Sequence, residues 1–300
     1  MSQSFKPKEF VVAKTESEAI ELLKKYGEKA RIIAGGTGVY EVAHRGLFAE
    51  VEVLIDITRL ELNYVRRDEG FLRIGSCATM SSIFETSSLA EIPELVALVD
   101  ALKTIQPLQV KNVATVGGAI CTALPFFDLP VSLIALDADV VIAPDGRTVK
   151  LEDFIQGYFA VDLREGEFVR EILVPLKKTS SERIGSSFLK FALTGDDWAI
   201  INCGSRVEIG EQDTLCTVRL CFGGGVGEKP RRVPRLEMKL AGVKMSDEAD
   251  LKSILNQNID GELEPVSDLK ASSKYRMHLA KVLARRSIIR SANVAKQRLA

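Results

Sequence analysis

Arg31-Ile32-Ile33-Ala34-Gly35-Gly36-Thr37-Gly38-Val39-Tyr40 is the stretch that decides the fold of this 300-residue chain. Its apolar start predicts a short buried strand, which breaks into a glycine loop and continues as a helix. Three of the four residues from Gly35 to Gly38 lack a Cβ, so the backbone there can lie directly against a ligand. The first N–H groups of a helix have no partner within the helix, and the helix dipole favours an anion beside them. This stretch therefore predicts a site for a phosphate-bearing molecule.

The residues on either side of the glycine loop predict a small unit in which strands and helices alternate. Residues 9–13 are expected to form a strand, and the capping box at Thr15–Glu18 opens a helix that ends at Gly27. Residues 51–57 are rich in β-branched side chains and predict a third strand after the loop. The first 57 residues are thus expected to run strand, helix, strand, helix, strand.

The rest of the chain predicts a mixture of strands and helices, with a polar link at residues 177–184. A hairpin is expected at residues 63–75, and residues 106–129 show only weak periodicity. Before the link we expect helices at 81–87 and 92–104 and strands at 139–143 and 167–174; after it, antiparallel strands at 187–193, 199–208 and 214–222 and helices at 236–240, 247–255 and 274–298. This order predicts an α+β fold of three parts, residues 1–58, 59–176 and 185–300.

Composition argues against several classes of function. The net charge is −1 and the pI is near 6.3, so no electrostatic field argues for nucleic acid or for a membrane surface. No apolar run reaches the roughly 18 residues of a transmembrane helix, and the N-terminus lacks the apolar core of a signal peptide, so we expect a cytoplasmic protein. The five cysteines form no Cys-x-x-Cys pair and there are two histidines, which disfavours a zinc site, an iron–sulfur cluster or a Ser-His-Asp triad in this chain. If the protein is an enzyme, a bound cofactor is expected to supply the difficult chemistry.

A second stretch brings small residues and a glycine pair to one point: Val110-Lys111-Asn112-Val113-Ala114-Thr115-Val116-Gly117-Gly118-Ala119. Thr115 offers a hydroxyl, and the Gly117–Gly118 backbone can take a phosphate or a polar ring edge. Asp128 stands between Phe127 and Leu129, where it can accept hydrogen bonds from a ribose. Two glycine loops far apart in the chain suit one large ligand that is held at two places.

The first loop also allows a Rossmann interpretation. Gly36-Thr37-Gly38-Val39-Tyr40-Glu41 matches the first two glycines of the dinucleotide fingerprint, and Asp56 lies about where a ribose-binding acid would follow. The third glycine position holds Glu41, which is too large for close packing of the helix on a strand and brings a negative charge near the expected phosphate. A nucleotide-sensing Rossmann module is therefore an alternative that requires Asp56 at the ligand.

Together, the two glycine stretches resemble those of the FAD-binding medium subunit of molybdenum hydroxylases, the flavoprotein family of carbon monoxide dehydrogenase, xanthine dehydrogenase and nicotinate dehydrogenase. The resemblance continues through residues 128–130 and 136–141, resumes at Phe222-Gly223-Gly224-Gly225-Val226-Gly227 and ends in residues 275–286. It covers essentially the whole chain, in order. It implies the two-subdomain FAD-binding fold of the vanillyl-alcohol-oxidase type, with a C-terminal α+β lobe of three antiparallel strands and helices that covers the FAD.

The resemblance also implies roles for particular residues toward FAD. The two loops would wrap the pyrophosphate, Asp128 would bind a ribose or ribityl hydroxyl, and Leu173 and Lys190 would contact the flavin. Trp198 stands where relatives of the carbon monoxide dehydrogenase type carry a tyrosine beside the isoalloxazine, so it would shield or gate one flavin face. The implied cofactor-binding residues are Ile33, Ala34, Gly35, Gly36, Thr37, Gly38, Thr115, Val116, Gly117, Gly118, Ala119, Asp128, Leu173, Lys190 and Trp198. No catalytic residue and no metal ligand is predicted.

Some positions depart from the family pattern. Ala119 stands where the second motif commonly ends in asparagine, and Leu124 replaces a residue that is often polar, so FAD affinity and redox potential are the properties that these changes affect. In the wider fold superfamily a histidine at the end of the first loop can bind FAD covalently. Thr37 and Gly38 occupy that region, so FAD is expected to be held non-covalently.

The resemblance implies an FAD-carrying electron-transfer subunit of a three-part molybdenum hydroxylase. The molybdenum cofactor and [2Fe-2S] clusters would lie only in partner subunits, a large molybdenum-binding subunit and a small iron–sulfur subunit, in a dimer of heterotrimers. Electrons would pass from the iron–sulfur clusters through FAD to an external acceptor such as a quinone, oxygen or NAD. The alternative is a self-contained FAD-dependent oxidoreductase of the same fold, which needs a substrate-facing acid, base or nucleophile; the sequence offers only Lys190, Tyr40 and the pair Asp196–Asp197. The basic residues of the last helix either face solvent or contact partner subunits.

Overall fold

The computed structural model describes residues 5–176 and 183–297, which form two compact units. The first unit comprises Met1–Glu85, Pro107–Ala123 and Asp139–Val174, and the second comprises Thr86–Gln106, Leu124–Ala138 and Pro175–Ala300. Both units combine sheets with helices, so the predicted α+β class is confirmed. Residues 177–182 of the predicted link lie outside the described residues. Among the described helices, none is both long and apolar enough to cross a membrane.

The first unit begins with a small parallel sheet in the order β1-β3-β2. Its strands are β1 (Glu9–Val12), β2 (Ala30–Ile33) and β3 (Val53–Asp56), connected through α1 (Glu16–Tyr26), the 3-10 helix η1 (Gly27–Lys29) and α2 (Thr37–His44). The Thr15 hydroxyl accepts the Glu18 N–H at 3.1 Å, as in the predicted capping box, while the Glu18 carboxylate accepts the Lys14 N–H at 2.7 Å, one residue before the expected return partner. The predicted alternation of strands and helices is confirmed, and the parallel register places Ile33 beside Asp56 at the carboxyl ends of their strands.

A five-stranded sheet in the order β4-β5-β10-β6-β7 completes the first unit. The strands are β4 (Val65–Asp68), β5 (Phe71–Gly75), β6 (Asp139–Ala143), β7 (Arg147–Lys150) and β10 (Phe168–Pro175), and the other elements are α3 (Met80–Phe84), α5 (Leu108–Val113), α6 (Val116–Thr122), α8 (Leu151–Phe154), β8 (Ile155–Gly157) and β9 (Ala160–Val161). The hairpin expected at residues 63–75 is present as β4 and β5. The stretch without clear periodicity, residues 106–129, contains two helices of six and seven residues, α5 and α6, which are too short to show a helical repeat.

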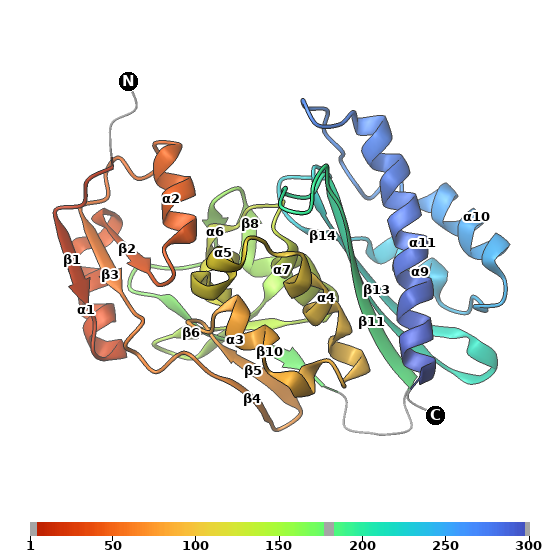
Figure 1. Ribbon diagram of the computed structural model, residues 1–300, viewed down its shortest axis with the longest axis horizontal. Coiled ribbons are helices and arrows are strands. Elements are labelled where there is room, and N and C mark those ends of the chain that lie inside the picture. Colours follow the sequence, from red (N-terminus) through yellow and green to blue (C-terminus); the bar gives the residue numbers. More distant parts are fainter. Residues whose placement is uncertain (1–4, 177–182, 298–300) are drawn as a thin grey trace. The chain divides into compact units, whose positions relative to one another are not determined.

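The second unit is built on an antiparallel sheet, β11 (Arg183–Phe191), β12 (Ile201–Ile209), β13 (Leu215–Gly224) and β14 (Arg231–Arg232). Helix α11 (Ser273–Gln297) runs along this sheet (Figure 1). The remaining elements are η2 (Ser87–Leu89), η3 (Pro93–Leu95), α4 (Val96–Thr104), α7 (Asp128–Ala135), η4 (Glu211–Asp213), α9 (Pro234–Leu240) and α10 (Glu248–Asn258). The three strands and three helices predicted after the link are confirmed, and β14 adds a fourth, very short strand.

Two glycines allow helices to approach opposite faces of the β11–β14 sheet. A Cβ on Gly204 would lie 3.0 Å from the backbone oxygen of Val131 on α7, and a Cβ on Gly185 would lie 2.2 Å from the backbone oxygen of Ser291 on α11. Gly185 pairs with Val207, which is an odd number of residues from Gly204 along β12, so the two glycines face opposite sides. Helix α7 therefore covers one face and α11 the other.

The glycine run at the end of β13 encloses a buried arginine. A Cβ on Gly225 would lie 2.0 Å from Nη1 of Arg276, whose residue is 1% exposed. Arg276 donates from Nη2 to both carboxylate oxygens of Asp268 at 2.8 Å and from Nη1 to the Val266 carbonyl at 3.0 Å. This guanidinium holds the loop between α10 and α11 against the end of β13.

Most of the basic residues on α11 are engaged within their own unit. Besides Arg276, the ion pairs along the helix are Lys281 with Asp260, Arg285 with Glu248, Arg290 with Asp100, and Lys296 with Asp213. The charge of this helix therefore serves contacts inside the second unit, while Arg298 lies outside the described residues.

Candidate functional site

The two glycine stretches lie against each other within the first unit. A Cβ on Gly35 would lie 1.8 Å from the backbone oxygen of Val113, and a Cβ on Gly38 would lie 2.3 Å from Oγ1 of Thr122 on α6. Real Cβ contacts are essentially never shorter than 3.0 Å, so neither position accepts a side chain without movement. Glycine is therefore required at Gly35, where the contact is with backbone, and favoured at Gly38, where the Thr122 side chain would have to move.

The N-terminus of α2 is open to a ligand. Its N-cap, Gly36, adopts a left-handed conformation with φ 73° and ψ −11°, and no side chain caps the helix. The first turn carries no acidic residue, and residues 33–38 are each only half-buried. Uncapped N–H groups at the positive end of a helix dipole suit a phosphate, so this loop fits the phosphate-bearing cofactor that the sequence predicts.

The second loop combines its own cap with an accessible backbone. Thr115 is the N-cap of α6, and its Oγ1 accepts the Gly118 N–H at 3.1 Å, which leaves the hydroxyl hydrogen for another partner. Gly118 is exposed and Ala119 is half-buried, whereas Val116 and Gly117 are buried. The accessible part of this loop is therefore Gly118–Ala119.

The second loop is held in place by the chain that follows β5. A Cβ on Gly117 would lie 2.7 Å from the backbone oxygen of Ser76, and the Gly117 N–H donates to that same oxygen at 2.9 Å. The Val116 N–H donates to the Ala78 carbonyl at 3.0 Å. Sequence reasoning missed Ser76 and Ala78, because their backbone contacts depend on a pairing between distant segments that no local pattern signals.

Leu173 lies half-buried on β10, two residues after a buried carboxylate. That carboxylate, Glu171, accepts from the Tyr64 hydroxyl at 3.0 Å and from Nη1 of Arg73 at 2.8 Å. Burial and the bond to Glu171 raise the pKa of Tyr64 to about 12, so the phenol stays protonated near neutral pH. The cluster fixes β10 near Leu173.

Asp128 and Lys190 form a direct ion pair within the second unit. The Lys190 ammonium lies 2.9 Å from Oδ2 of Asp128, and both side chains are nearly buried, at 10% and 6% exposure. Oδ2 also accepts from Oγ1 of Thr104 at 2.9 Å, and Oδ1 accepts from Nδ2 of Asn202 at 2.7 Å. A carboxylate has about four acceptor positions, so one is left for the hydroxyl contact that the sequence predicts for Asp128. Thr104 and Asn202 were not predicted, because α4 and β12 meet Asp128 only in the folded unit.

Trp198 lies in a cluster of three aromatic rings. Its ring stacks on Phe126 with centroids 6.0 Å apart and planes at 7°, and it meets Phe127 edge-on at 6.2 Å and 76°. Offset stacking and edge contacts are the favoured arrangements of such rings and hold the indole in one orientation. Phe126 and Phe127 directly precede Asp128, so one short segment carries both the aromatic cluster and the partner of Lys190.

Asp56 has a local use in the structure. Its Oδ1 accepts the Thr58 N–H at 2.8 Å, which caps the turn after β3. The Rossmann alternative required this carboxylate at a ribose.

Residues 5–176 and 183–297 contain no group of three or more His, Cys, Asp or Glu side chains placed to hold a metal ion. All five cysteines are free.

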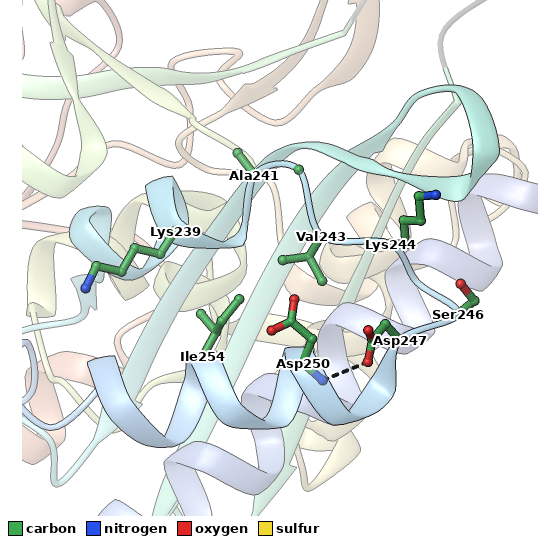
Figure 2. Close-up of a pocket in the computed structure, with 9 residues that line it drawn as sticks. Lys239, Ala241, Val243, Lys244, Ser246, Asp247, Asp250 and Ile254 are labelled. Carbon is green, nitrogen blue, oxygen red and sulfur yellow. Dashed lines mark hydrogen bonds between the residues drawn. The ribbon is translucent and has the colours of Figure 1, made fainter.

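A separate hollow of about 580 Å³ lies in the second unit between α9 and α10. Figure 2 shows Val243, Ile254 and Asp250 around its centre, with Lys239 and Lys244 at opposite ends. Asp247 accepts the Asp250 N–H at 2.9 Å, so the start of α10 is already capped. None of the predicted cofactor-binding residues lines this hollow, whose lining is Lys239, Ala241, Gly242, Val243, Lys244, Ser246, Asp247, Asp250 and Ile254.

Comparison with known proteins agrees with the geometry of the two loops. The family model described as the FAD binding domain in molybdopterin dehydrogenase matches residues 3–177, and the model of the CO dehydrogenase flavoprotein C-terminal domain matches residues 186–291. The chain is 32% identical over 286 residues to the glyceraldehyde dehydrogenase medium chain of Sulfolobus acidocaldarius, covering 92% of this chain and 96% of the relative. It is 29% identical over 284 residues to the carbon monoxide dehydrogenase medium chain of Hydrogenophaga pseudoflava, covering 93% and 95%.

The fold is shared with solved structures over nearly the whole chain. A chain of the carbon monoxide dehydrogenase from Hydrogenophaga pseudoflava that lacks the Mo-pyranopterin moiety of its cofactor matches with a TM-score of 0.86 and 28% identity, covering 98% of each chain. A chain of quinoline 2-oxidoreductase from Pseudomonas putida 86 matches with a TM-score of 0.85 and 25% identity, covering 98% of this chain and 99% of that one. The predicted fold and the predicted resemblance are both confirmed. This chain is an oxidoreductase subunit that belongs to the family of FAD-binding flavoproteins of molybdopterin dehydrogenases.

Proposed function

We propose that this chain holds one FAD without a covalent bond and serves as the electron-transfer subunit of a heteromeric molybdenum hydroxylase. In this role it passes electrons from the iron–sulfur clusters of a small partner subunit through FAD to an external acceptor. The substrate is oxidised in a large molybdenum-binding partner. FAD, when bound, would supply the redox chemistry of this subunit.

The observation that carries the proposal is the close approach of the two glycine loops. Gly35 and Gly38 have no room for a Cβ, and the uncapped start of α2 opens beside the second loop. This arrangement provides uncapped backbone N–H groups at the start of α2, the hydroxyl hydrogen of Thr115 from the second loop, and no carboxylate in the first turn of α2, which is an environment that suits a pyrophosphate. We assign pyrophosphate binding to residues 33–38 and 115–119.

We assign contacts with the flavin end of the cofactor to Leu173, Lys190 and Trp198. In the proposal Leu173 makes an apolar or backbone contact, Lys190 presents its ammonium to the flavin, and Trp198 covers one face and excludes water. The ion pair between Lys190 and Asp128 supports this role, because a lysine that is 10% exposed keeps its ammonium in one place only when a fixed anion holds it.

The proposal extends to the assembly. The relatives are named medium chains, and we propose a dimer of heterotrimers in which this chain is the medium subunit. A cytoplasmic location is part of the proposal, since five free cysteines suit a reducing compartment.

The first experiment is the absorbance of the purified full chain. We expect the near-ultraviolet and blue bands of oxidised flavin, and release of intact FAD on acid precipitation because no covalent bond holds it. A colourless chain that cannot be reconstituted with FAD would refute the proposal. Purification from the native source tests the assembly: a large molybdenum-containing subunit and an iron–sulfur subunit should accompany the chain, whereas full substrate turnover by the isolated chain would support the self-contained oxidoreductase instead.

A further inference from the structure

Asn202 lies at the centre of a row of residues that crosses the β11–β14 sheet. Lys190 on β11 pairs with Asn202 on β12, and Asn202 pairs with Gly223 on β13. Residues paired in this way point to the same face of a sheet. Asn202 is fully buried, at 0% exposure.

The orientation of the Asn202 amide is fixed by its neighbours. Its Nδ2 donates to Oδ1 of Asp128 at 2.7 Å, and the opposite orientation would set two oxygens against each other. Its Oδ1 occupies the space beside Gly223, where a Cβ would approach it to 2.5 Å. That buried Oδ1 has no hydrogen-bond partner among the described residues, and burying an acceptor without a partner is destabilising. A buried amide kept at this cost indicates that its donation to Asp128 has a use beyond packing.

The contacts of Asp128 define that use. Asn202 holds Oδ1, while Thr104 and Lys190 both bind Oδ2. With a neutral donor on each oxygen the carboxylate has no freedom to rotate, so the position of Oδ2 sets where the Lys190 ammonium lies. The three donors come from β12, α4 and β11, which fixes the carboxylate from three directions.

We propose that Asn202 is a positioning residue that acts through Asp128 to fix the Lys190 ammonium, and that it thereby sets the reduction potential of the bound flavin. This inference rests on the proposed function, in which Lys190 faces the flavin. Reduction adds negative charge to a flavin, so a cation held nearby raises the potential and a cation that moves away lowers it. Thr104 acts on the same carboxylate from the other oxygen.

The test compares flavin midpoint potentials of the FAD-loaded full chain, measured by dye-coupled reduction. Lys190→Met should shift the oxidised-to-reduced equilibrium at least tenfold toward the oxidised form, which is about 30 mV for a two-electron couple. Asn202→Leu should shift it severalfold in the same direction. In the Lys190→Met background Asn202→Leu should have no further effect on the potential, because its action passes through Lys190.

Two further variants keep the test decisive. Thr104→Val should lower the flavin potential by less than Asn202→Leu does, and Thr104→Ser, which keeps the hydroxyl, should leave the potential normal. These two variants also serve as the test if Asn202→Leu fails to fold. Ser205→Ala, on the opposite face of β12, is the control and should lower the melting temperature without moving the potential.

The outcomes separate the inference from the proposed function. The positioning role would be overturned if Asn202→Leu shifted the flavin potential equally in the normal chain and in the Lys190→Met background. It would also be overturned if Asn202→Leu lowered the stability and left the potential unchanged. FAD binding would stand in either case. An unchanged potential in Lys190→Met would remove Lys190 from the flavin and the inference with it. Failure of the unsubstituted chain to bind FAD would overturn both.

Discussion

The contact between Gly38 and Thr122 yields the sharpest test of the two-loop site. In Gly38→Ala the new Cβ would lie 2.3 Å from Oγ1 of Thr122, so one of the two must give way by about 0.7 Å to reach the 3.0 Å limit. The Thr122 hydroxyl is not free to turn aside without loss, because it donates to the Gly118 carbonyl at 2.7 Å. The clash therefore acts on the second loop at Gly118, the position with the most accessible backbone.

The size of the effect follows from these contacts. Losing the Thr122 hydrogen bond costs about 1 kcal/mol, and forcing the side chain off its rotamer costs roughly another 1 kcal/mol. If this loss of about 2 kcal/mol reduces the free energy of FAD binding, the dissociation constant of Gly38→Ala for FAD rises about thirtyfold. Thr122→Ala alone removes one exposed hydrogen bond and should change affinity severalfold at most.

The double variant decides the argument. With Thr122→Ala the nearest remaining atom to the new Cβ is the residue 122 Cβ at 3.5 Å, an ordinary van der Waals contact. Gly38→Ala should therefore cost little in that background, and the coupling between the two changes should be about 1 kcal/mol or more. The assay is titration of apoprotein with FAD, followed by quenching of flavin fluorescence. Additive losses in the double variant would refute the claim that α2 and α6 form one site.

Three further outcomes are expected. Gly35→Ala should weaken FAD binding more than Gly38→Ala in the same titration, because its Cβ meets backbone at 1.8 Å and no side chain can relieve it, whereas Gly157→Ala, with nothing within 4 Å, should bind FAD normally. Arg276→Lys should lower the stability to urea of the full chain by about 3 kcal/mol, since a lysine cannot reproduce the bidentate pair at this fully buried position. The pKa of Tyr64 is about 12 in the folded chain and about 10 in the unfolded chain, so this group contributes its full stability below pH 10 and loses it as the pH rises toward 12. The melting temperature of Tyr64→Phe should therefore fall less between pH 10 and pH 12 than that of the unsubstituted chain.

The elements that could be predicted from the sequence are those with enough repeats to show a period. Strands β11, β12 and β13 have nine or ten residues each, and their alternation predicted them to within a few residues. Helix α6 has seven residues and β14 has two, which is too little for either period to appear. Packing between segments fixes such short elements, so a single sequence does not signal them.

The residues of the candidate site likewise fall into those that the sequence predicted and those that only the structure identified. A glycine can be recognised in the sequence as a place where the backbone can be approached closely, because it has no side chain. Both glycine stretches were found on that basis. Asn202 and Thr104 were not found, because a buried polar side chain becomes meaningful only when its partner is known, and here the partner comes from a distant segment. Asp128 was singled out by its place between Phe127 and Leu129, and Lys190 by resemblance alone. The structure adds the direct contact between them.

The missing third glycine of the first loop now has a physical explanation. In a Rossmann fingerprint that glycine lets the helix pack closely on its strand. Here it is replaced by Glu41, which forms an ion pair with Arg45 one turn later at 2.7 Å on the surface of α2. The close approach is made instead by Gly38, which faces Thr122 of α6. A loop that packs against a second loop has no need of a glycine facing the sheet, so Glu41 at this position fits the two-loop FAD site that we propose better than a single-loop dinucleotide site.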